Sequence, residues 1–187
     1  MRIAVTGAAS GIGSVIANEL SSLGARVAIC DKDADRVQAF TADHGNIFTS
    51  VGNVSNETDV IDFFSSVEAK LGGLDALINN AGIAGPMTNL EKFNFADWQK
   101  TISVNLNGAF LCSKEAIPML RASGGGSIIN IGSTSSFFGT PLRSAYSATK
   151  WALIGLTKTW AMEYGHENIR VNAICPGSVN GPRIERV

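Results

Sequence analysis

Short apolar segments alternate with longer amphipathic segments along the chain, and this alternation restricts the possible folds more than any other feature. Strands are predicted at 2–6, 26–30, 47–51, 74–78, 127–131 and 169–174, and helices near 12–23, 33–43, 56–71, 95–122 and 144–165. The strand segments are continuous apolar runs, as is typical of parallel strands covered by helices on both faces. We therefore expect an α/β fold with a doubly wound parallel sheet.

Helix boundaries are marked by residues with known capping preferences. Gly24 and Gly72 follow two predicted helices at positions that favour a left-handed backbone. Ser55 and Asn56 precede an amphipathic segment, as is typical of a helix start. Because no repeat, low-complexity segment or linker interrupts the alternation, we expect residues 1–187 to form one domain.

Composition and charge argue against several classes of protein. Of the 187 residues, 45% are hydrophobic and 17% are charged, which is typical of a globular chain. With 15 Lys and Arg against 16 Asp and Glu, the net charge of -1 argues against a nucleic-acid-binding protein that depends on a basic surface. No apolar run approaches the roughly 20 residues of a membrane span, and no signal-peptide pattern is present.

Cysteines and histidines are few and scattered. The separation of Cys30, Cys112 and Cys175 favours reduced core residues over a disulfide framework, so we expect a cytoplasmic protein. His44 and His166 have no neighbours at the spacing of metal ligands, so no metal site is expected.

A glycine-rich segment, TGAASGIG at 6–13, joins the first predicted strand to the first helix. In a doubly wound sheet, ligands bind at the carboxyl ends of the strands, where this segment lies. Gly7 allows the turn to close, Gly11 allows the backbone to approach a pyrophosphate, and Gly13 allows the helix to pack on the strand. The helix beginning near Ile12 directs its free N–H groups towards the anion. The alternative is a glycine-rich turn that binds no ligand.

Asp31 ends the second strand, where a carboxylate can accept hydrogen bonds from the ribose hydroxyls of adenosine. A 2′-phosphate would be repelled there, Ser10 supplies no positive charge, and Lys32 does not remove the carboxylate. NAD is therefore favoured over NADP. The alternative is a solvated aspartate that opens a turn, and at this stage the same layout could also hold S-adenosylmethionine in a methyltransferase.

Tyr146 and Lys150 are four residues apart in a helical segment and so share one face. A phenol titrates near pH 10, and a nearby ammonium makes it a better acid–base group at neutral pH by stabilising the phenolate. Ser133 ends the fifth strand, at the same carboxyl edge, and Asn105 lies inside the helix that follows the fourth.

These residues, taken in order, resemble the motifs of the short-chain dehydrogenase/reductase family from Thr6 to Val179. TGAASGIG resembles its cofactor loop, NNAG at 79–82 the motif that closes the fourth strand, and VN at 104–105 the site of the active-site asparagine. Ser133, Tyr146 and Lys150 match the serine, tyrosine and lysine, and PG at 176–177 matches the loop beside nicotinamide. A methyltransferase does not require this ordered set of residues, so the resemblance argues against the methyltransferase alternative.

The resemblance implies a Rossmann fold and hydride transfer between a nicotinamide cofactor and a secondary alcohol or ketone. Tyr146 would be the general acid and base, Ser133 would bind the substrate oxygen, Lys150 would bind the nicotinamide ribose, and Asn105 would hold a relay water. The cofactor contacts implied are Gly7, Ser10, Gly11, Ile12, Gly13, Asp31, Asn53, Val54, Asn80, Ala81, Gly82, Tyr146, Lys150, Pro176, Gly177 and Val179.

The chain departs from the family pattern at two points. Asn53-Val54 stands where the family often has Asp-Val with the aspartate bonded to adenine; asparagine both donates and accepts, so we expect adenine binding to be kept. Gly181 stands where a threonine commonly contacts the nicotinamide part of the cofactor, so backbone groups near Val179 are expected to carry that contact.

Other conspicuous residues have two interpretations each. Phe137 and Phe138 follow Ser133 and could line a substrate pocket or pack against apolar neighbours. Arg143 could bind an acidic substrate but is expected to be solvated.

Partners are expected to be a small alcohol or carbonyl compound and further copies of the chain, as a dimer or tetramer. Trp151, Trp160 and Phe110 lie on helices that resemble the oligomer-forming pair of the family, which makes them core or interface residues.

Two alternative functions remain open, a non-catalytic dinucleotide-binding or assembly module and an NADP-dependent carbonyl reductase. Members of the family continue with a substrate-covering lid and a seventh strand. The 187 residues stop at Val187, so we expect these parts to be missing, substrate binding to suffer more than cofactor binding, and the sixth strand to be an exposed edge.

Overall fold

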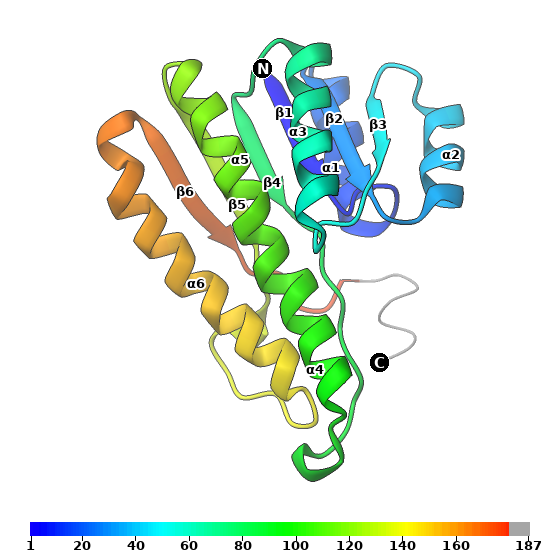
Figure 1. The fold of residues 1–187 in the computed structure, drawn as a ribbon, viewed down its shortest axis with the longest axis vertical. Coiled ribbons are helices and arrows are strands. Elements are labelled where there is room, and N and C mark those ends of the chain that lie inside the picture. The colour runs from blue at the N-terminus through cyan, green and yellow to red at the C-terminus, as the bar shows by residue number, and fades with distance from the viewer. Residues whose placement is uncertain (180–187) are drawn as a thin grey trace.

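Six parallel strands make up the sheet of the computed structural model, which describes residues 1–179 (Figure 1). Their order across the sheet is β3-β2-β1-β4-β5-β6. The strands are β1 Arg2–Thr6, β2 Arg26–Asp31, β3 Phe48–Val51, β4 Ala76–Asn79, β5 Gly126–Ile131 and β6 Ile169–Ile174. The predicted doubly wound parallel sheet is confirmed, and every predicted strand is present to within about two residues.

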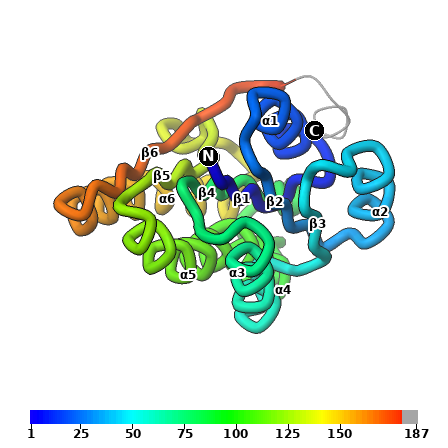
Figure 2. Tube along the Cα trace, turned by 90° about the horizontal axis from the view of Figure 1, so that it is seen from above, coloured from blue at the N-terminus to red at the C-terminus, as the bar shows by residue number. Residues whose placement is uncertain are grey.

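Helices cover both faces of the sheet, as Figure 2 shows. The helices are α1 Gly11–Ser22, α2 Ala34–Asp43, α3 Glu57–Leu71, α4 Phe95–Ile102, α5 Gly108–Ala122 and α6 Ser144–Tyr164. Two apolar clusters result, one in which α1 and α2 pack on the sheet and one in which α3, α5 and α6 pack on its other face. This two-sided burial accounts for the apolar central strands. The expectation of continuous apolar strands does not hold at the two edges, because β3 has no buried residue and β6 alternates buried and exposed residues.

The helix signals in the sequence correspond to caps in the structure. Gly72 ends α3 with φ +72°, and Gly24 follows α1 with φ +85°. Asn56 caps α3, its side chain accepting from the backbone N–H groups of Thr58 and Asp59.

One helix prediction needs correction. The segment 95–122 is not a single α-helix, because a π-helical turn at Ser103–Asn107 separates α4 from α5. In this turn the N–H of Gly108 bonds the carbonyl of Ser103, five residues back instead of four. Asn105 lies in the turn, and such turns are frequent at functional sites.

The aromatic residues named as core or interface separate into two groups. Trp160 is buried in the core, whereas Trp151 is 52% exposed and Phe110 is half exposed. These two side chains are available to a second copy of the chain, although the oligomeric state stays a prediction. Of the helices in residues 1–179, none has the length and apolar composition that a membrane span requires.

The strand order places a switch point between β1 and β4. From β1 the chain proceeds outward through β2 to β3, then returns to the other side of β1 and proceeds outward again through β5 to β6. The loops that follow β1 and β4 therefore leave the sheet in opposite directions and leave a crevice at its carboxyl edge. The functional residues are expected in this crevice.

Candidate active site

In the glycine loop between β1 and α1, Gly11 faces open space. Gly11 has φ +61°, and a Cβ atom built there would have no atom within 4 Å. A side chain is thus excluded by backbone conformation and not by crowding, and the open space lies at the N-terminus of α1, where N–H groups are free. Residues of this type and arrangement fit the pyrophosphate of a dinucleotide.

Gly7 and Gly13 lie where loops pack closely together. A Cβ at Gly7 would lie 2.7 Å from Cα of Ala81, so the loop after β1 touches the loop after β4. A Cβ at Gly13 would lie 2.5 Å from Nδ2 of Asn80 and 2.6 Å from the carbonyl oxygen of Gly7. Gly13 therefore packs on the loops at the carboxyl edge and not on the body of a strand.

The NNAG segment clamps this loop in place. Nδ2 of Asn80 donates to the carbonyl oxygens of Thr6 at 3.0 Å and Gly7 at 2.8 Å. The hydroxyl of Thr6 accepts in turn from the N–H groups of Asn80 and Ala81. In residues 1–179 the Asn80 side chain thus holds the glycine loop through these bonds, and its contact with a cofactor stays a prediction.

Asp31 lies beside the glycine loop at the end of β2. Its carboxylate accepts from the N–H groups of Ala9 and Asp33, both at 3.2 Å. Sequence reasoning missed Arg36, whose guanidinium donates to the hydroxyl of Ser10 at 3.0 Å and pairs with Asp33 at 3.0 Å. The sequence did contain a signal for Arg36. It lies in the first turn of the helix that follows β2, and such a turn begins at the carboxyl edge of the sheet, where the glycine loop also lies.

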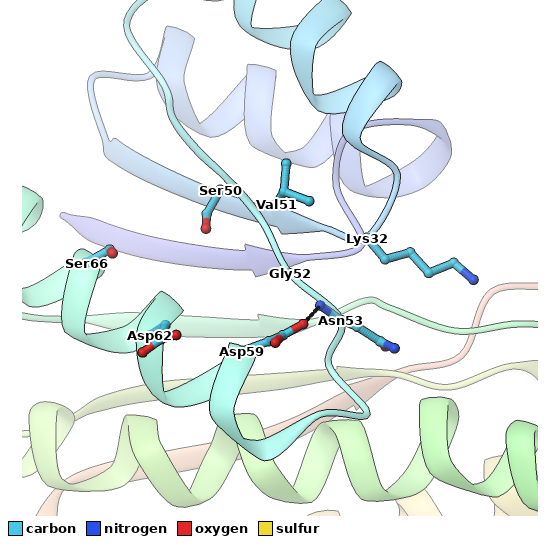
Figure 3. A pocket seen from close by; sticks show the side chains of 8 residues that line it. All are labelled: Lys32, Ser50, Val51, Gly52, Asn53, Asp59, Asp62 and Ser66. Atoms are coloured by element: carbon cyan, nitrogen blue, oxygen red, sulfur yellow. Dashed lines mark hydrogen bonds between the residues drawn. The ribbon is translucent and has the colours of Figure 1, made fainter.

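A polar cavity of about 230 Å³ lies between β3 and α3 (Figure 3). Its lining residues are Lys32, Ser50, Val51, Gly52, Asn53, Asp59, Asp62 and Ser66. The carboxylate of Asp59 accepts from the backbone N–H of Asn53 at 2.9 Å, and Oδ1 of Asn53 accepts from both the N–H and the hydroxyl of Ser55. Val54 is buried, and its predicted contact with a cofactor stays a prediction.

Tyr146 and Lys150 lie in the first two turns of α6 and face each other. Nζ of Lys150 is 5.7 Å from the centre of the Tyr146 ring and donates to the carbonyl oxygen of Ile131 at 2.6 Å. Lys150 is only 5% exposed. The ammonium is thus fixed beneath the phenol at the end of β5, where it can stabilise negative charge on the phenol oxygen.

Ser133 lies two residues beyond the end of β5 and caps the short turn Thr134–Ser136, which packs against α6. Its hydroxyl accepts from the N–H of Ser135 at 3.2 Å. This bond leaves the hydroxyl proton free to donate to another group.

Asn105 is almost completely buried and bonds the chain after β4. Its Oδ1 accepts from the N–H of Ile83 at 2.7 Å, and its Nδ2 donates to the carbonyl of Ile83 at 2.9 Å and to the hydroxyl of Thr149 at 3.2 Å. Both amide protons are therefore used by protein groups. The side chain positions the β4 loop against α6, and the relay water assigned to it stays a prediction.

The PG loop lies beside the turn that begins at Ser133. The carbonyl of Pro176 accepts from the N–H of Thr134 at 3.0 Å, and a Cβ at Gly177 would lie 3.8 Å from the methyl group of Thr134. Val179 is exposed. Gly181, the second departure from the family pattern, lies outside the described residues.

Arg143 is not the solvated residue that was expected. It precedes α6 and is only 7% exposed, with one long hydrogen bond of 3.4 Å to the carbonyl of Ala84. Phe137 and Phe138, in contrast, are exposed, so packing within residues 1–179 does not account for them.

The buried thiols are unsuited to nucleophilic chemistry. Burial raises the pKa of Cys30 to about 12 and raises the pKa of Cys112 as well, so both stay protonated at neutral pH. Within residues 1–179, no three His, Cys, Asp or Glu side chains lie close enough together to hold a metal ion.

Comparison with known proteins decides the family. A family model described as short chain dehydrogenase matches residues 1–186. The chain belongs to the short-chain dehydrogenase family. The predicted family is thereby confirmed, and its members named below are dehydrogenases and reductases, so the chain is an oxidoreductase.

Three relatives show how far the similarity within the short-chain dehydrogenases extends. Levodione reductase of Leifsonia aquatica is 33% identical over 98% of this chain and 71% of its own length. Trans-4-hydroxycyclohexanecarboxylate dehydrogenase of Sinomonas cyclohexanicum is 40% identical over 95% of this chain and 72% of its own length. The structure of NAD+-bound xylitol dehydrogenase superposes with a TM-score of 0.94 at 32% identity, over 98% of this chain and 73% of that one.

Proposed function

We propose that this short-chain dehydrogenase interconverts a secondary alcohol and a ketone with NAD, and that Tyr146 is its general acid and base. One observation carries the proposal: Lys150 is buried beneath the Tyr146 ring at the carboxyl edge of the sheet, 5.7 Å from the ring centre. The bound nicotinamide supplies a hydride acceptor or donor. The protein supplies proton transfer and orientation.

Each side chain of the site has a distinct task in this proposal. In alcohol oxidation, Tyr146 takes the proton of the substrate hydroxyl as the carbon loses its hydride, and in ketone reduction it returns that proton to the oxygen. Ser133 donates its free hydroxyl proton to the same oxygen and holds it in register. Lys150 stabilises the negative charge that Tyr146 carries in its proton-accepting form. Asn105 is a positioning residue that fixes the loop after β4.

The preference for NAD rests on the charge beside the glycine loop. The Asp31 carboxylate is held there by Ala9 and Asp33, where it can accept from ribose hydroxyls and repel a 2′-phosphate. Arg36 opposes this repulsion, because its guanidinium reaches Ser10 in the same loop. We therefore propose a preference for NAD that depends on one carboxylate.

The substrate class follows from the relatives. By their names, one relative is a dehydrogenase of a hydroxycyclohexanecarboxylate, one is a reductase of levodione and one is a dehydrogenase of xylitol. A hydroxyl or ketone group is what these compounds share. We propose that such a group on a small molecule is the reacting centre for this chain too.

The test is a screen of secondary alcohols and ketones followed by a tyrosine substitution. Wild-type protein should change NADH absorbance with at least one of 4-hydroxycyclohexanecarboxylate, 3-hydroxybutyrate, their carboxamides, cyclohexanol or the matching ketones. Tyr146→Phe should lower kcat at least about 100-fold, because general acid–base catalysis contributes about that much. NAD affinity, measured by calorimetry, should change little, since no cofactor contact is removed from the glycine loop.

Tyr164 provides the matched control, because it is the other tyrosine of the chain and lies at the far end of α6. Tyr164→Phe should keep wild-type turnover. A Tyr146→Phe protein with near-normal kcat would overturn the assignment of Tyr146. Cofactor binding without turnover on any compound would favour the non-catalytic module instead.

A further inference from the structure

Arg143 is a buried cation without a charged partner among residues 1–179. Its side chain is 7% exposed, and no carboxylate in that range lies within ion-pair distance of it. A guanidinium stays charged in proteins and presents five N–H donors, of which one is used within residues 1–179, in the 3.4 Å bond to Ala84. Arginine is rarely this buried unless it is paired with a negative charge, so we expect an anion to bind this side chain.

The position of Arg143 ties it to the proposed active site. It occupies the N-cap position of α6, three residues before Tyr146, so both residues belong to the start of the same helix. Its partner Ala84 lies two residues beyond Gly82, where a Cβ would be 3.8 Å from Nζ of Lys150. The guanidinium therefore lies between the start of α6 and the loop that passes Lys150.

The chain is held firmly at this point, at a conformational cost. Leu142 has φ +63°, a left-handed conformation that is uncommon outside glycine and costs a branched residue strain. Its carbonyl accepts from the N–H of Thr88 at 3.1 Å, so the segment before Arg143 is bonded to the same β4 loop. Arg143 is thereby presented by two segments that are bonded to each other, which is how a rigid recognition group is built.

We propose that Arg143 binds the carboxylate of the substrate, which makes the substrate a hydroxy acid or keto acid. A carboxylate matches the planar guanidinium through two parallel N–H···O bonds, and it would compensate the buried charge. With the carboxylate at Arg143, the reacting oxygen of the same molecule lies towards Tyr146. The inference rests on the proposed function and adds the charge of the substrate to it.

The experiment compares acids with uncharged partners of the same shape, using intact protein and NAD. The probes are 4-hydroxycyclohexanecarboxylate and 3-hydroxybutyrate, each against its carboxamide. Wild type should show the higher kcat/KM with the acids. Arg143→Gln should lower kcat/KM for the acids about 10- to 100-fold and leave the amides nearly unchanged, as expected for loss of a hydrogen-bonded charge pair. Arg143→Lys should lie between the two.

Arg170 is the matched control, because it is an exposed arginine on β6. Arg170→Gln should keep the preference for acids. An equal loss of activity on acids and amides in Arg143→Gln would mean that Arg143 only holds the β4 loop, and it would overturn the inference. A wild-type protein that oxidises neutral alcohols but does not prefer acids would overturn the inference while leaving the proposed function intact.

Failure of the proposed function gives a different result. Wild type would then turn over none of the probes, and binding of cyclohexanecarboxylate to the protein with NADH, measured by calorimetry, decides the inference alone. Binding that Arg143→Gln abolishes and Arg170→Gln retains supports it. Absence of binding, or equal binding by all three proteins, overturns it.

Discussion

Gly13→Ala should destabilise the protein, although helix propensity alone predicts the reverse. Replacing a helical glycine by alanine gains about 1 kcal/mol where the site is open. At Gly13 the new Cβ would lie 2.5 Å from Nδ2 of Asn80, 2.6 Å from the carbonyl oxygen of Gly7 and 2.8 Å from Cα of Ala8. Two of these three atoms belong to the backbone and cannot rotate away.

The magnitude follows from what must move. Overpacking of this kind costs about 1–3 kcal/mol, and displacing the Asn80 amide weakens its two hydrogen bonds to the glycine loop, at about 1 kcal/mol each. After subtracting the gain in helix propensity, we expect a net loss of about 2 kcal/mol. For a chain of this length, that lowers Tm by about 4–8 °C. NAD affinity should fall as well, because the displaced loop is the proposed pyrophosphate site.

Gly165→Ala supplies the control for this prediction. Gly165 has φ −58° and ψ −35°, and a Cβ there would have no atom within 4 Å. Alanine fits without strain and should stabilise the protein by about 0.4–1 kcal/mol. Thermal and urea unfolding of the two variants beside wild type are the assay. If Gly13→Ala melts at or above the wild-type temperature, the close packing on the loops is not what excludes a side chain there.

Two further substitutions test the charges. Asp31→Ala should weaken NAD binding and improve NADP binding, because it removes the carboxylate that repels a 2′-phosphate. The double variant Asp31→Ala/Arg36→Ala should lose the gain in NADP affinity, because the guanidinium beside the loop is also removed. If Asp31→Ala leaves the ratio of the NAD and NADP affinities unchanged, Asp31 acts only in a turn. Asp75→Asn should cost about 1 kcal/mol at pH 7, because Arg2 holds the pKa of the Asp75 carboxyl below its usual range. That stability is fully present above about pH 4 and declines as the pH falls from there through the lower folded-state pKa. A difference between the unfolding free energies of wild type and variant that does not decrease as the pH falls below about 4 would contradict the argument.

The fold could be predicted because its signals are local and repeated. The central strands β1 and β4 are runs of mostly buried residues, and α3 has its own start and stop residues, Asn56 and Gly72. The π turn around Asn105 could not be predicted in this way, since the apolar spacing of 95–122 suits a continuous helix. In this turn Asn105 accepts from Ile83, 22 residues away in sequence, and a contact at that distance leaves no local pattern.

Contacts between buried polar groups could not be predicted from the sequence either. Asn130 lies in the apolar run of β5, yet it is fully buried and accepts at 2.9 Å from Asn79, its neighbour across the sheet. It also donates to Thr157 on α6 at 2.9 Å. The sequence shows the polar residues but not that they meet, because their partners come from separate elements.

The positions of the proposed site residues could be read from the sequence, but their contacts could not. The family motifs gave the positions of Tyr146, Lys150 and Asn105 by spacing alone, and the structure gathers these three at one edge. Arg143 was expected in solvent because an isolated arginine usually is. Its burial depends on a loop almost 60 residues earlier, which no local pattern reports. The prediction of one domain over the whole chain stays a prediction.

The first part of the loop after β4, residues 80–85, connects the proposed cofactor site with the proposed substrate site. On one side it touches Gly7 so closely that no side chain fits between them. On the other it bonds Asn105 through both backbone groups of one residue, passes close to Lys150, and accepts from Arg143. A shift of this loop would therefore move the glycine loop and the start of α6 together. Close packing against Gly7 fixes one side of this segment, and backbone hydrogen bonds to Asn105 fix the other side. The segment therefore keeps the proposed cofactor site and the proposed substrate site in a fixed position relative to each other.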